Sequence, residues 1–387
     1  MKWEYKTLDQ LGEVSRGRSK HRPRNDPSLF GGKYPFIQTA DIKAANFYIT
    51  EYDTTYNEKG LAQSRLWNPG TLCITIAANI ADTGILAMDA CFPDSVMGFL
   101  PYERIADVRF VKYCFDILQQ NCKKISQGAA QDNLSWEKLS TILFPAPPIE
   151  VQTKIADILS TYDNLIENNQ KQIKLLEEAA QRLYKEWFVD LRFPGHENTK
   201  ITDGIPEGWR RERLVDLVDV QYGYAFDGSQ FNATRNGMPI IRIRNIPSGN
   251  TCDYTTEKVD VQYVVHNGDI LVGMDGEFHI NSWSGPDAYL VQRTCSFRPN
   301  KSSMKGYLLQ AIYEPIKFFE STVVGATVAH LGKKHIDTIS VLTCPDNLYV
   351  PFQKYYEQRQ LLLNQNWLLT EARDRWLPKL MSGEIEV

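Results

Sequence analysis

The chain of 387 residues contains an internal repeat, and this repeat restricts its architecture more than any other feature of the sequence. Trp3, Leu8 and Leu11 recur 206 residues later as Trp209, Leu214 and Leu217. Further matches follow in the same order: Val14 with Val220, Gly17 with Gly223, 35–42 with 239–246, 68–72 with 266–270, 128–134 with 325–331, and 141–142 with 338–339. The pattern predicts two copies of one domain, with small insertions in surface loops.

A long helix is expected after the first copy. No Gly or Pro interrupts residues 149–193, and apolar residues recur there at alternating steps of four and three, which is a heptad pattern. The positions of this seam that we expect to pack against a partner helix are Ile155, Leu159, Tyr162, Ile166, Asn169, Ile173, Leu176, Leu183 and Trp187. A helix of roughly 35–40 residues at 1.5 Å per residue is about 55 Å long.

A second, shorter helix is expected after the second copy. Leu362, Leu369 and Trp376 lie on one stripe, which Pro378 and Gly383 should end. A helix with a single apolar seam needs a partner, so we predict that the two helices pack as an antiparallel pair.

Polar residues also fall in or near this seam. Asn169 should lie beside Gln365 or Asn366. Such residues either set the register of the pair or are tolerated near a solvated end, and the sequence leaves both interpretations open.

The fold class that follows is α+β. We expect two globular α/β domains in pseudo-repeat, separated by two long helices packed as an antiparallel coiled coil. The boundaries are one domain at 1–147, a long helix at 148–193, a second domain at 194–347 and a second helix at 348–387, with 194–208 as the linker into the second domain.

Charge excludes a uniformly basic protein that coats nucleic acid, because the formal net charge is −4. Residues 1–147 carry 17 Lys or Arg against 16 Asp or Glu, and residues 194–347 carry 15 against 18. Basic side chains therefore matter only as local patches.

The expected location is the cytoplasm. The sequence has no apolar run of about 18 residues and no secretory h-region at its start. Its seven cysteines are scattered without a Cys-x-x-Cys pair, which favours reduced thiols over disulfides or zinc. We predict no membrane contact and no metal site.

The sequence contains no convincing catalytic motif. Gly325 to Lys334 is too long for a phosphate-binding loop and lacks the Ser or Thr after its lysine, and no Gly-x-Ser-x-Gly elbow is present. Residues 146–149 (Ala-Pro-Pro-Ile) lack the polar first residue and the aromatic of an adenine-methyltransferase loop. We therefore predict that the chain is not an enzyme.

Three segments are candidates for contacting DNA. In the first copy, a basic loop is followed by a short strand pattern that ends in polar residues, and the candidates are Arg16, Arg18, Lys20, Arg22, Arg24, Lys33, Gln38, Thr39 and Lys43. A solvated surface is the alternative for the basic loop.

The corresponding stretch of the second copy provides Arg235, Arg242, Arg244 and Asn245. Here Arg242 and Arg244 should share one face of an alternating strand. They suit either base or phosphate contacts. A third segment, with Gln127 in the first copy and Lys333 and Lys334 in the second, is either a phosphate contact or a tight turn.

Taken together, these features resemble the specificity subunit of a type I restriction–modification enzyme. The resemblance covers essentially the whole chain and rests on the Trp-x4-Leu-x2-Leu start of each copy, the Gly-Ala-x4-Leu elements at 128–134 and 325–331, and the run from Phe144 to Gln152 that leads into the long helix. The second copy departs from this last run, since its prolines at 345 and 351 are split.

The resemblance implies two target-recognition domains that each read one half of a bipartite double-stranded DNA site. The helices would set the gap between the half-sites and dock two modification subunits. Those subunits would bind S-adenosylmethionine, separate restriction or motor subunits would use ATP and Mg, and this chain would bind no cofactor. An alternative function, of a different class, is that of a cytosolic protein-binding scaffold with duplicated domains.

Overall fold

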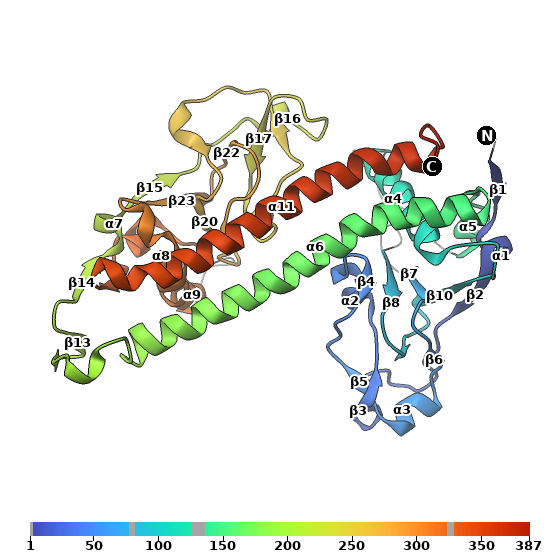
Figure 1. The fold of residues 1–387 in the computed structure, drawn as a ribbon, viewed down its shortest axis with the longest axis horizontal. Coiled ribbons are helices and arrows are strands. Elements are labelled where there is room, and N and C mark those ends of the chain that lie inside the picture. Colours follow the sequence, from blue (N-terminus) through green and yellow to red (C-terminus); the bar gives the residue numbers. More distant parts are fainter. Residues whose placement is uncertain (1–2, 77–81, 126–135, 323–328) are drawn as a thin grey trace. The chain divides into compact units, whose positions relative to one another are not determined.

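The computed structural model describes residues 3–76, 82–125, 136–322 and 329–387. The chain divides into two compact units, the first formed by Met1–Glu167 with Leu369–Val387 and the second by Asn168–Leu368. Both divisions fall inside long helices, α6 (Ile149–Tyr184) and α11 (Val350–Met381), which are green and red in Figure 1. Each helix therefore contributes one part to each unit.

The first unit is built around a five-stranded sheet of order β2-β10-β7-β8-β4, in which only the β4–β8 pair is parallel. Its strands are β1 (Glu4–Lys6), β2 (Gly12–Arg16), β3 (Phe30–Pro35), β4 (Tyr48–Ile49), β5 (Thr55–Tyr56), β6 (Leu66–Trp67), β7 (Leu72–Thr75), β8 (Thr83–Leu86), β9 (Ala90–Cys91), β10 (Val96–Pro101) and β11 (Phe144–Ala146). Its shorter helices are α1 (Leu8–Leu11), α2 (Thr39–Ala44), α3 (Glu58–Ala62), α4 (Val108–Ile125) and α5 (Trp136–Leu139).

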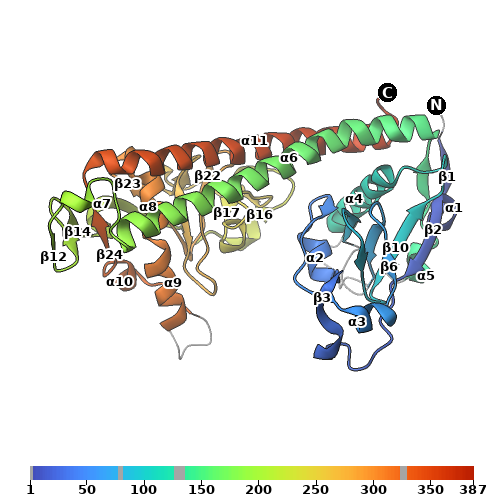
Figure 2. The ribbon, with the colours of Figure 1, turned by 60° about the horizontal axis from the view of Figure 1, so that its bottom comes forward.

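The core of the first unit lies between the sheet, α4 and the two long helices. Phe99 of β10 and Phe110 of α4 are buried together with Ile155 and Leu159 of α6 and Leu377 of α11. Figure 2 shows α4 between the strands and α6. The last turns of α11 thus belong to the core of the first unit.

The second unit repeats this plan with a four-stranded sheet, β15-β23-β20-β21, and a five-stranded sheet, β16-β18-β17-β22-β19. The strands are β12 (Ile201–Thr202), β13 (Ile205–Pro206), β14 (Arg210–Arg213), β15 (Val218–Tyr222), β16 (Phe231–Asn232), β17 (Met238–Ile241), β18 (Tyr254–Thr255), β19 (Val264–Val265), β20 (Ile270–Gly273), β21 (Ile280–Ser282), β22 (Ala288–Leu290), β23 (Thr294–Pro299) and β24 (Ser340–Thr343). The shorter helices are α7 (Leu214–Leu217), α8 (Lys305–Ala311), α9 (Tyr313–Thr322) and α10 (Lys333–Ile336).

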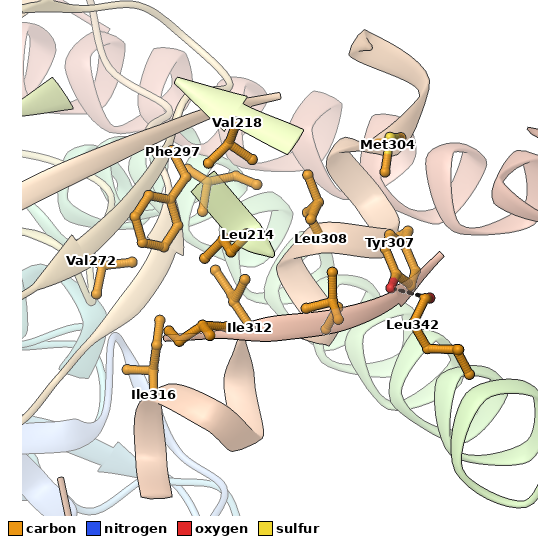
Figure 3. Packing of buried hydrophobic residues seen from close by; sticks show 14 of the residues in the cluster. Leu214, Val218, Val272, Phe297, Met304, Tyr307, Leu308, Ile312, Ile316 and Leu342 are labelled. Atoms are coloured by element: carbon orange, nitrogen blue, oxygen red, sulfur yellow. Dashed lines mark hydrogen bonds between the residues drawn. The ribbon is translucent and has the colours of Figure 1, made fainter. Parts of the chain in front are cut away.

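Figure 3 shows the core of the second unit. Leu308, Ile312 and Ile316 from the α8–α9 region are buried with Leu214 of α7 and Phe297 of β23. The hydroxyl of Tyr307, a fully buried side chain, donates to the carbonyl oxygen of Leu342 at 2.5 Å. Burial of the hydroxyl is therefore compensated by a hydrogen bond.

Two glycines show how closely the halves correspond. Gly17 follows β2, which pairs with β10, and Gly223 follows β15, which pairs with β23. A Cβ atom would lie 2.3 Å from the Pro93 carbonyl oxygen at Gly17, and 2.0 Å from the Val291 carbonyl oxygen at Gly223. Both positions therefore require glycine because of close backbone approach. The repeat predicted from the sequence is a repeat of structure.

The start of each long helix is also equivalent in the two halves. Gln152 of α6 accepts from the backbone N–H of Asp107 at 3.1 Å, and Gln353 of α11 accepts from the N–H of Gly306 at 3.4 Å. The split prolines before α11 thus leave the glutamine contact in place.

Within each unit the two long helices run antiparallel. In the first unit Arg373 of α11 is paired with Asp163 of α6. In the second unit Arg359, fourteen residues earlier in α11, is paired with Glu177, fourteen residues later in α6. Partner residues that come late in α11 lie opposite residues that come early in α6, which is the pairing of antiparallel helices.

Most of the expected seam faces inward. Ile155, Leu159, Ile166, Asn169 and Ile173 are buried. Tyr162, Leu176, Leu183, Trp187, Leu362 and Leu369 are partly buried. Asn169 donates from Nδ2 to Oδ1 of Asn366 at 2.9 Å and lies 3.4 Å from Oε1 of Gln365, so the expected polar contact is present.

The end of α11 corrects two expectations. Pro378 does not end the helix, which continues to Met381 and is 32 residues long, nearly as long as the 36 residues of α6. Trp376 is 43% exposed, whereas the neighbouring Leu377 is 2% exposed. Burial of Leu377, Leu380 and Met381 offsets the backbone hydrogen bond that proline cannot make, and it rotates Trp376 out of the seam.

Two further findings concern the whole described chain. Six cysteines, Cys73, Cys91, Cys114, Cys252, Cys295 and Cys344, are free thiols. In the described ranges, no helix combines the length and apolarity needed to cross a membrane.

Candidate nucleic-acid interface

The basic loop of the first unit begins where β2 ends. Arg16 is the last residue of β2, and the loop then lies against the neighbouring chain, because the N–H of Arg18 donates to the Phe92 carbonyl at 3.1 Å and the Ser64 hydroxyl donates to the Arg18 carbonyl at 2.8 Å. The backbone is thus fixed while all five basic side chains are exposed.

These five side chains differ in their partners. Arg24 and Arg22 lie 2.8 and 3.9 Å from the carboxylate of Asp94. Arg16, Arg18 and Lys20 have no ionic partner in the part of the chain that the structure describes. Arg16, Arg18 and Lys20 are therefore better suited to bind phosphate than Arg22 and Arg24, since no carboxylate among the described residues neutralises their charges.

A pocket of about 420 Å³ opens beside this loop. Its lining combines aromatic, amide, hydroxyl and guanidinium groups from Ser19, Arg24, Asn25, Phe30, Phe36, Gln38, Thr39, Thr54, Pro93 and Ser95. The ring of Phe36 stacks on the buried ring of Tyr56 with centroids 4.0 Å apart, and Phe30 lies 5.1 Å from Tyr56. Gln38 and Thr39, expected to contact bases, thus share a site with the basic Arg24.

The local cause of this arrangement is a capped turn. Gln38 follows the buried Ile37, and its backbone N–H donates to the carboxylate of Asp41 at 2.6 Å, which starts α2. The side-chain Nε2 of Gln38 lies 3.3 Å from the hydroxyl of Thr54. Ile42 is buried beneath the turn, so its first residue is held in place while its side chain is exposed.

The same turn recurs in the second unit at Arg242. Its backbone N–H donates to Oδ1 of Asn245 at 2.9 Å, and Ile241 and Ile246 are buried on either side. In both units the preceding strand or bridge pairs in parallel, Phe36 with Cys91 and Ile241 with Leu290. Gln38 and Arg242 therefore occupy equivalent positions.

This turn overturns our expectation for Arg242 and Arg244. Strand β17 ends at Ile241, and Ile243–Asn245 form a 3-10 turn, so the two arginines do not share a strand face. Arg242 lies over the ring of Phe231 at 4.4 Å, while Arg244 pairs with both carboxylate oxygens of Asp253 at 2.8 and 2.6 Å. The alternating pattern was misleading because the Asn245 side chain binds the backbone N–H of Arg242 and stabilises a turn there in place of a longer strand.

Asn245 is likewise placed differently from the expectation. Its side chain is 8% exposed and caps the turn, so it does not face solvent where a base edge could approach. This burial and this cap argue against a DNA contact by the Asn245 side chain.

The remaining candidates lie on the surface. Lys33 is 74% exposed, 3.4 Å from Glu58, and its pKa is raised by the neighbouring Tyr34 and by Glu58. Lys43, at the end of α2, and Arg235, in the turn before β17, are exposed, as are Lys333 and Lys334 at the start of α10. Gln127 and the segments 128–134 and 325–328 lie outside the described residues.

A second repeated motif was not recognised in the sequence, and its first copy lies near the pocket of the first unit. Asp26 accepts from the N–H of Ser28 at 2.9 Å, and Asp227 accepts from the N–H of Ser229 at 2.9 Å. The backbone and hydroxyl of Ser28, together with His21, lower the pKa of Asp26 to about 2, and Ser229 lowers the pKa of Asp227 in the same way.

The same motif also places an aromatic residue near the capped turn of each unit. Phe30 and Phe231 stand four residues after the two aspartates, the first lining the pocket and the second lying beneath Arg242. The signal that finds them is the pattern Asp-x-Ser-x-Phe at 26–30 and at 227–231.

Comparison with known proteins identifies the family of this duplicated fold. The family model described as the type I restriction modification DNA specificity domain matches residues 1–178 and 206–347. The chain belongs to this family. It carries two specificity domains, and its expected α+β architecture with paired long helices is confirmed.

Relatives of this specificity family match along the full chain. The type I restriction enzyme MjaIX specificity subunit of Methanocaldococcus jannaschii is 25% identical over 408 residues, covering 100% of this chain and 94% of the relative. The HindI specificity subunit of Haemophilus influenzae is 22% identical, covering 97% and 98% of the two proteins.

A solved structure shares the fold. The crystal structure of the type I restriction–modification S subunit from M. genitalium superposes with a TM-score of 0.54 at 15% identity, covering 98% of this chain and 96% of that one. This chain is therefore a specificity subunit of the type I restriction–modification class in both sequence and fold.

Proposed function

We propose that this chain is the non-catalytic DNA-reading subunit of a type I restriction–modification complex, with each globular domain binding one half of a bipartite duplex site. Residues 1–147 and 194–347 would be the two target-recognition domains. The observation that supports this function is the capped turn present in both units, which holds Gln38 in one and Arg242 in the other. The same backbone turn thus presents an amide in one unit and a guanidinium in the other, as the recognition of two different half-site sequences requires.

The helices at 148–193 and 348–387 would set the gap between the half-sites. With 36 residues, α6 is about 54 Å long at 1.5 Å per residue. Each unit has its own ion pair between α6 and α11, Arg373–Asp163 in the first and Arg359–Glu177 in the second. Linked binding modules gain affinity only when both reach their sites together, so a rigid helix pair makes binding depend on the gap.

The same helices would also dock two modification subunits. In the first unit Leu165 of α6 and Trp376 of α11 are 46% and 43% exposed. In the second unit Leu175 of α6 and Leu368 of α11 are 64% and 59% exposed. These exposed apolar side chains, present on the long helices of each unit, are the positions that we propose for partner contacts.

Cofactor chemistry would belong to the partners. We propose that the modification subunits bind S-adenosylmethionine and methylate adenine, and that restriction or motor subunits use ATP and Mg. This chain's own contribution would be to hold the DNA and to position the partners on it.

The test uses the chain assembled with its modification subunits. The complex is incubated with S-adenosylmethionine and a pool of duplexes of random sequence, and methylated positions are found by sequencing. We expect two half-sites separated by one fixed gap. If the complex assembles but neither binds nor methylates DNA over a titration of salt, the function fails and the protein-binding scaffold is favoured.

A further inference from the structure

The capped turn has a constant part and a variable part. The constant part is the backbone N–H of its first residue, bound by the side chain three residues later, which is Asp41 in one unit and Asn245 in the other. The variable part is the side chain of that first residue. Buried isoleucines on both sides hold the backbone of the turn in place.

Arg242 is prepared to make a planar contact. Its guanidinium lies 4.4 Å from the centroid of the Phe231 ring, which restrains the plane of the group. No side-chain acceptor for this guanidinium occurs among the described residues, whereas Arg244 donates to both oxygens of Asp253. A restrained guanidinium with unused donors matches the O6 and N7 acceptors of guanine in the major groove.

Gln38 stands in a different setting at the equivalent position. Its side chain lines the 420 Å³ pocket beside Phe30 and Phe36, and its Nε2 lies 3.3 Å from the hydroxyl of Thr54. An amide offers one donor and one acceptor side by side, which matches the N6 and N7 groups of adenine. The aromatic lining and the hydroxyls of the pocket leave space for the edge of a base.

We propose that the first residue of the capped turn is the base-reading position of each domain, with Gln38 selecting adenine in one half-site and Arg242 selecting guanine in the other. This inference rests on the proposed function and names its specificity-determining residues. It gives Arg244 and Asn245 no base contact, because their polar groups are bound within the protein.

The experiment compares half-sites methylated by complexes that contain variant chains. Arg242→Gln should change the preferred base at one position of one half-site, with a shift in discrimination of about 5- to 150-fold, the range of one bidentate contact. Gln38→Arg should change one position of the other half-site. The gap and all other positions should stay as in the unaltered complex.

Matched variants separate base reading from other effects. Arg244→Gln removes an arginine two residues away that is held by Asp253, and it should leave both half-sites unchanged. Arg242→Lys keeps the charge but loses the planar fork, so the guanine preference should weaken while the unfolding midpoint is kept.

Several results would overturn the inference. A uniform loss of methylation on all sequences by Arg242→Gln or Arg242→Lys would make Arg242 a phosphate contact. An altered half-site in Arg244→Gln, or unchanged half-sites in Gln38→Arg, would also contradict it. If the unaltered complex methylates without any sequence preference, the proposed function itself fails instead.

Discussion

The guanidinium of Arg373 on α11 donates to the carboxylate of Asp163 on α6, a side chain that is only 3% exposed. The same carboxylate accepts from the hydroxyl of Tyr113 on α4. One buried charge therefore joins three helices of the first unit. Removal of such a partner leaves the opposite charge without compensation in a place where water solvates it poorly.

Asp163→Asn should lower the free energy of unfolding. We expect a loss of about 3 kcal/mol, the lower end for a broken buried pair, because Arg373 keeps its contact with Asp374. Urea unfolding of the two proteins measures this loss in the free energy of unfolding. Arg375→Gln, which breaks a pair on a side chain that is 79% exposed, is the control and should cost about 0.5 kcal/mol or less. Equal losses in the two variants would show that the Asp163 contact adds nothing.

Stability should fall at alkaline pH. Burial, and then the charge of Asp163, raise the pKa of Tyr113 above its ordinary value of 10.0. Above pH 10 the unfolded chain therefore loses this proton while the folded chain keeps it, so unfolding becomes easier by up to about 1.4 kcal/mol per pH unit. Below pH 10 the contribution is fully present.

Urea unfolding between pH 8 and pH 11 measures this dependence. Tyr113→Phe should make the alkaline decline shallower by one titrating group, although it also loses a hydrogen bond at all pH values. Tyr102→Phe, at a side chain that is 46% exposed, is the control. An unchanged decline in Tyr113→Phe would contradict the assignment.

A paired insertion should lengthen the recognised gap. One added heptad after Asn169 in α6 and another after Gln365 in α11 keep Arg359–Glu177, Arg373–Asp163 and Asn169–Asn366 in register. Seven residues add about 10 Å of helix, close to three base pairs of DNA. Methylation mapping should show the same half-sites with a longer gap, and altered half-sites with the old gap would refute the spacer role. The insertion in α6 alone is the control, and it should impair assembly because the register is lost.

The basic loop should act on affinity without changing sequence preference. Arg18→Gln should reduce the salt dependence of DNA binding by the assembled complex by about 0.9 in log–log slope, as one phosphate contact is lost. Arg192→Gln makes the same charge change at a residue paired with Asp190 and should leave the slope unchanged. Titration with salt measures both, and equal slopes for the two variants would remove Arg18 from the interface.

Partner docking should fail one unit at a time. Leu165→Glu and Leu368→Glu place a charge on exposed apolar positions of the first and second unit. Each should reduce the number of bound modification subunits from two to one, measured by the mass of the purified complex. Retention of two subunits by both variants would move the docking surface elsewhere.

The large elements could be predicted from the sequence because their signals are long. The heptad steps from Ile155 to Leu183 and the repeated Trp-x4-Leu-x2-Leu pattern each involve many residues that must face a core. The end of α11 was misplaced because the cost of Pro378 is local, whereas the burial of Leu380 that compensates for it is tertiary.

The candidate site was harder to predict because its signals are short. Ile241 to Arg244 alternates like a strand, and only the cap from Asn245 turns it into a bend. The pocket in the first unit depends on Phe30, Phe36 and Gln38 coming together from separate elements, which no local pattern reveals. The basic residues were found as a group, but their pairing with Asp94 needed the structure.

The capped turn also bears on how such a protein could acquire new targets. The groups that stabilise its backbone are the cap and the buried isoleucines, whereas the side chain of Gln38 is exposed and that of Arg242 lies over the ring of Phe231. Under the proposed function, a single codon change at either position would alter the group offered to DNA while the cap and the buried isoleucines stay in place. Natural variation can then explore new recognition sequences one domain at a time, while the rest of the molecule remains under stabilising selection.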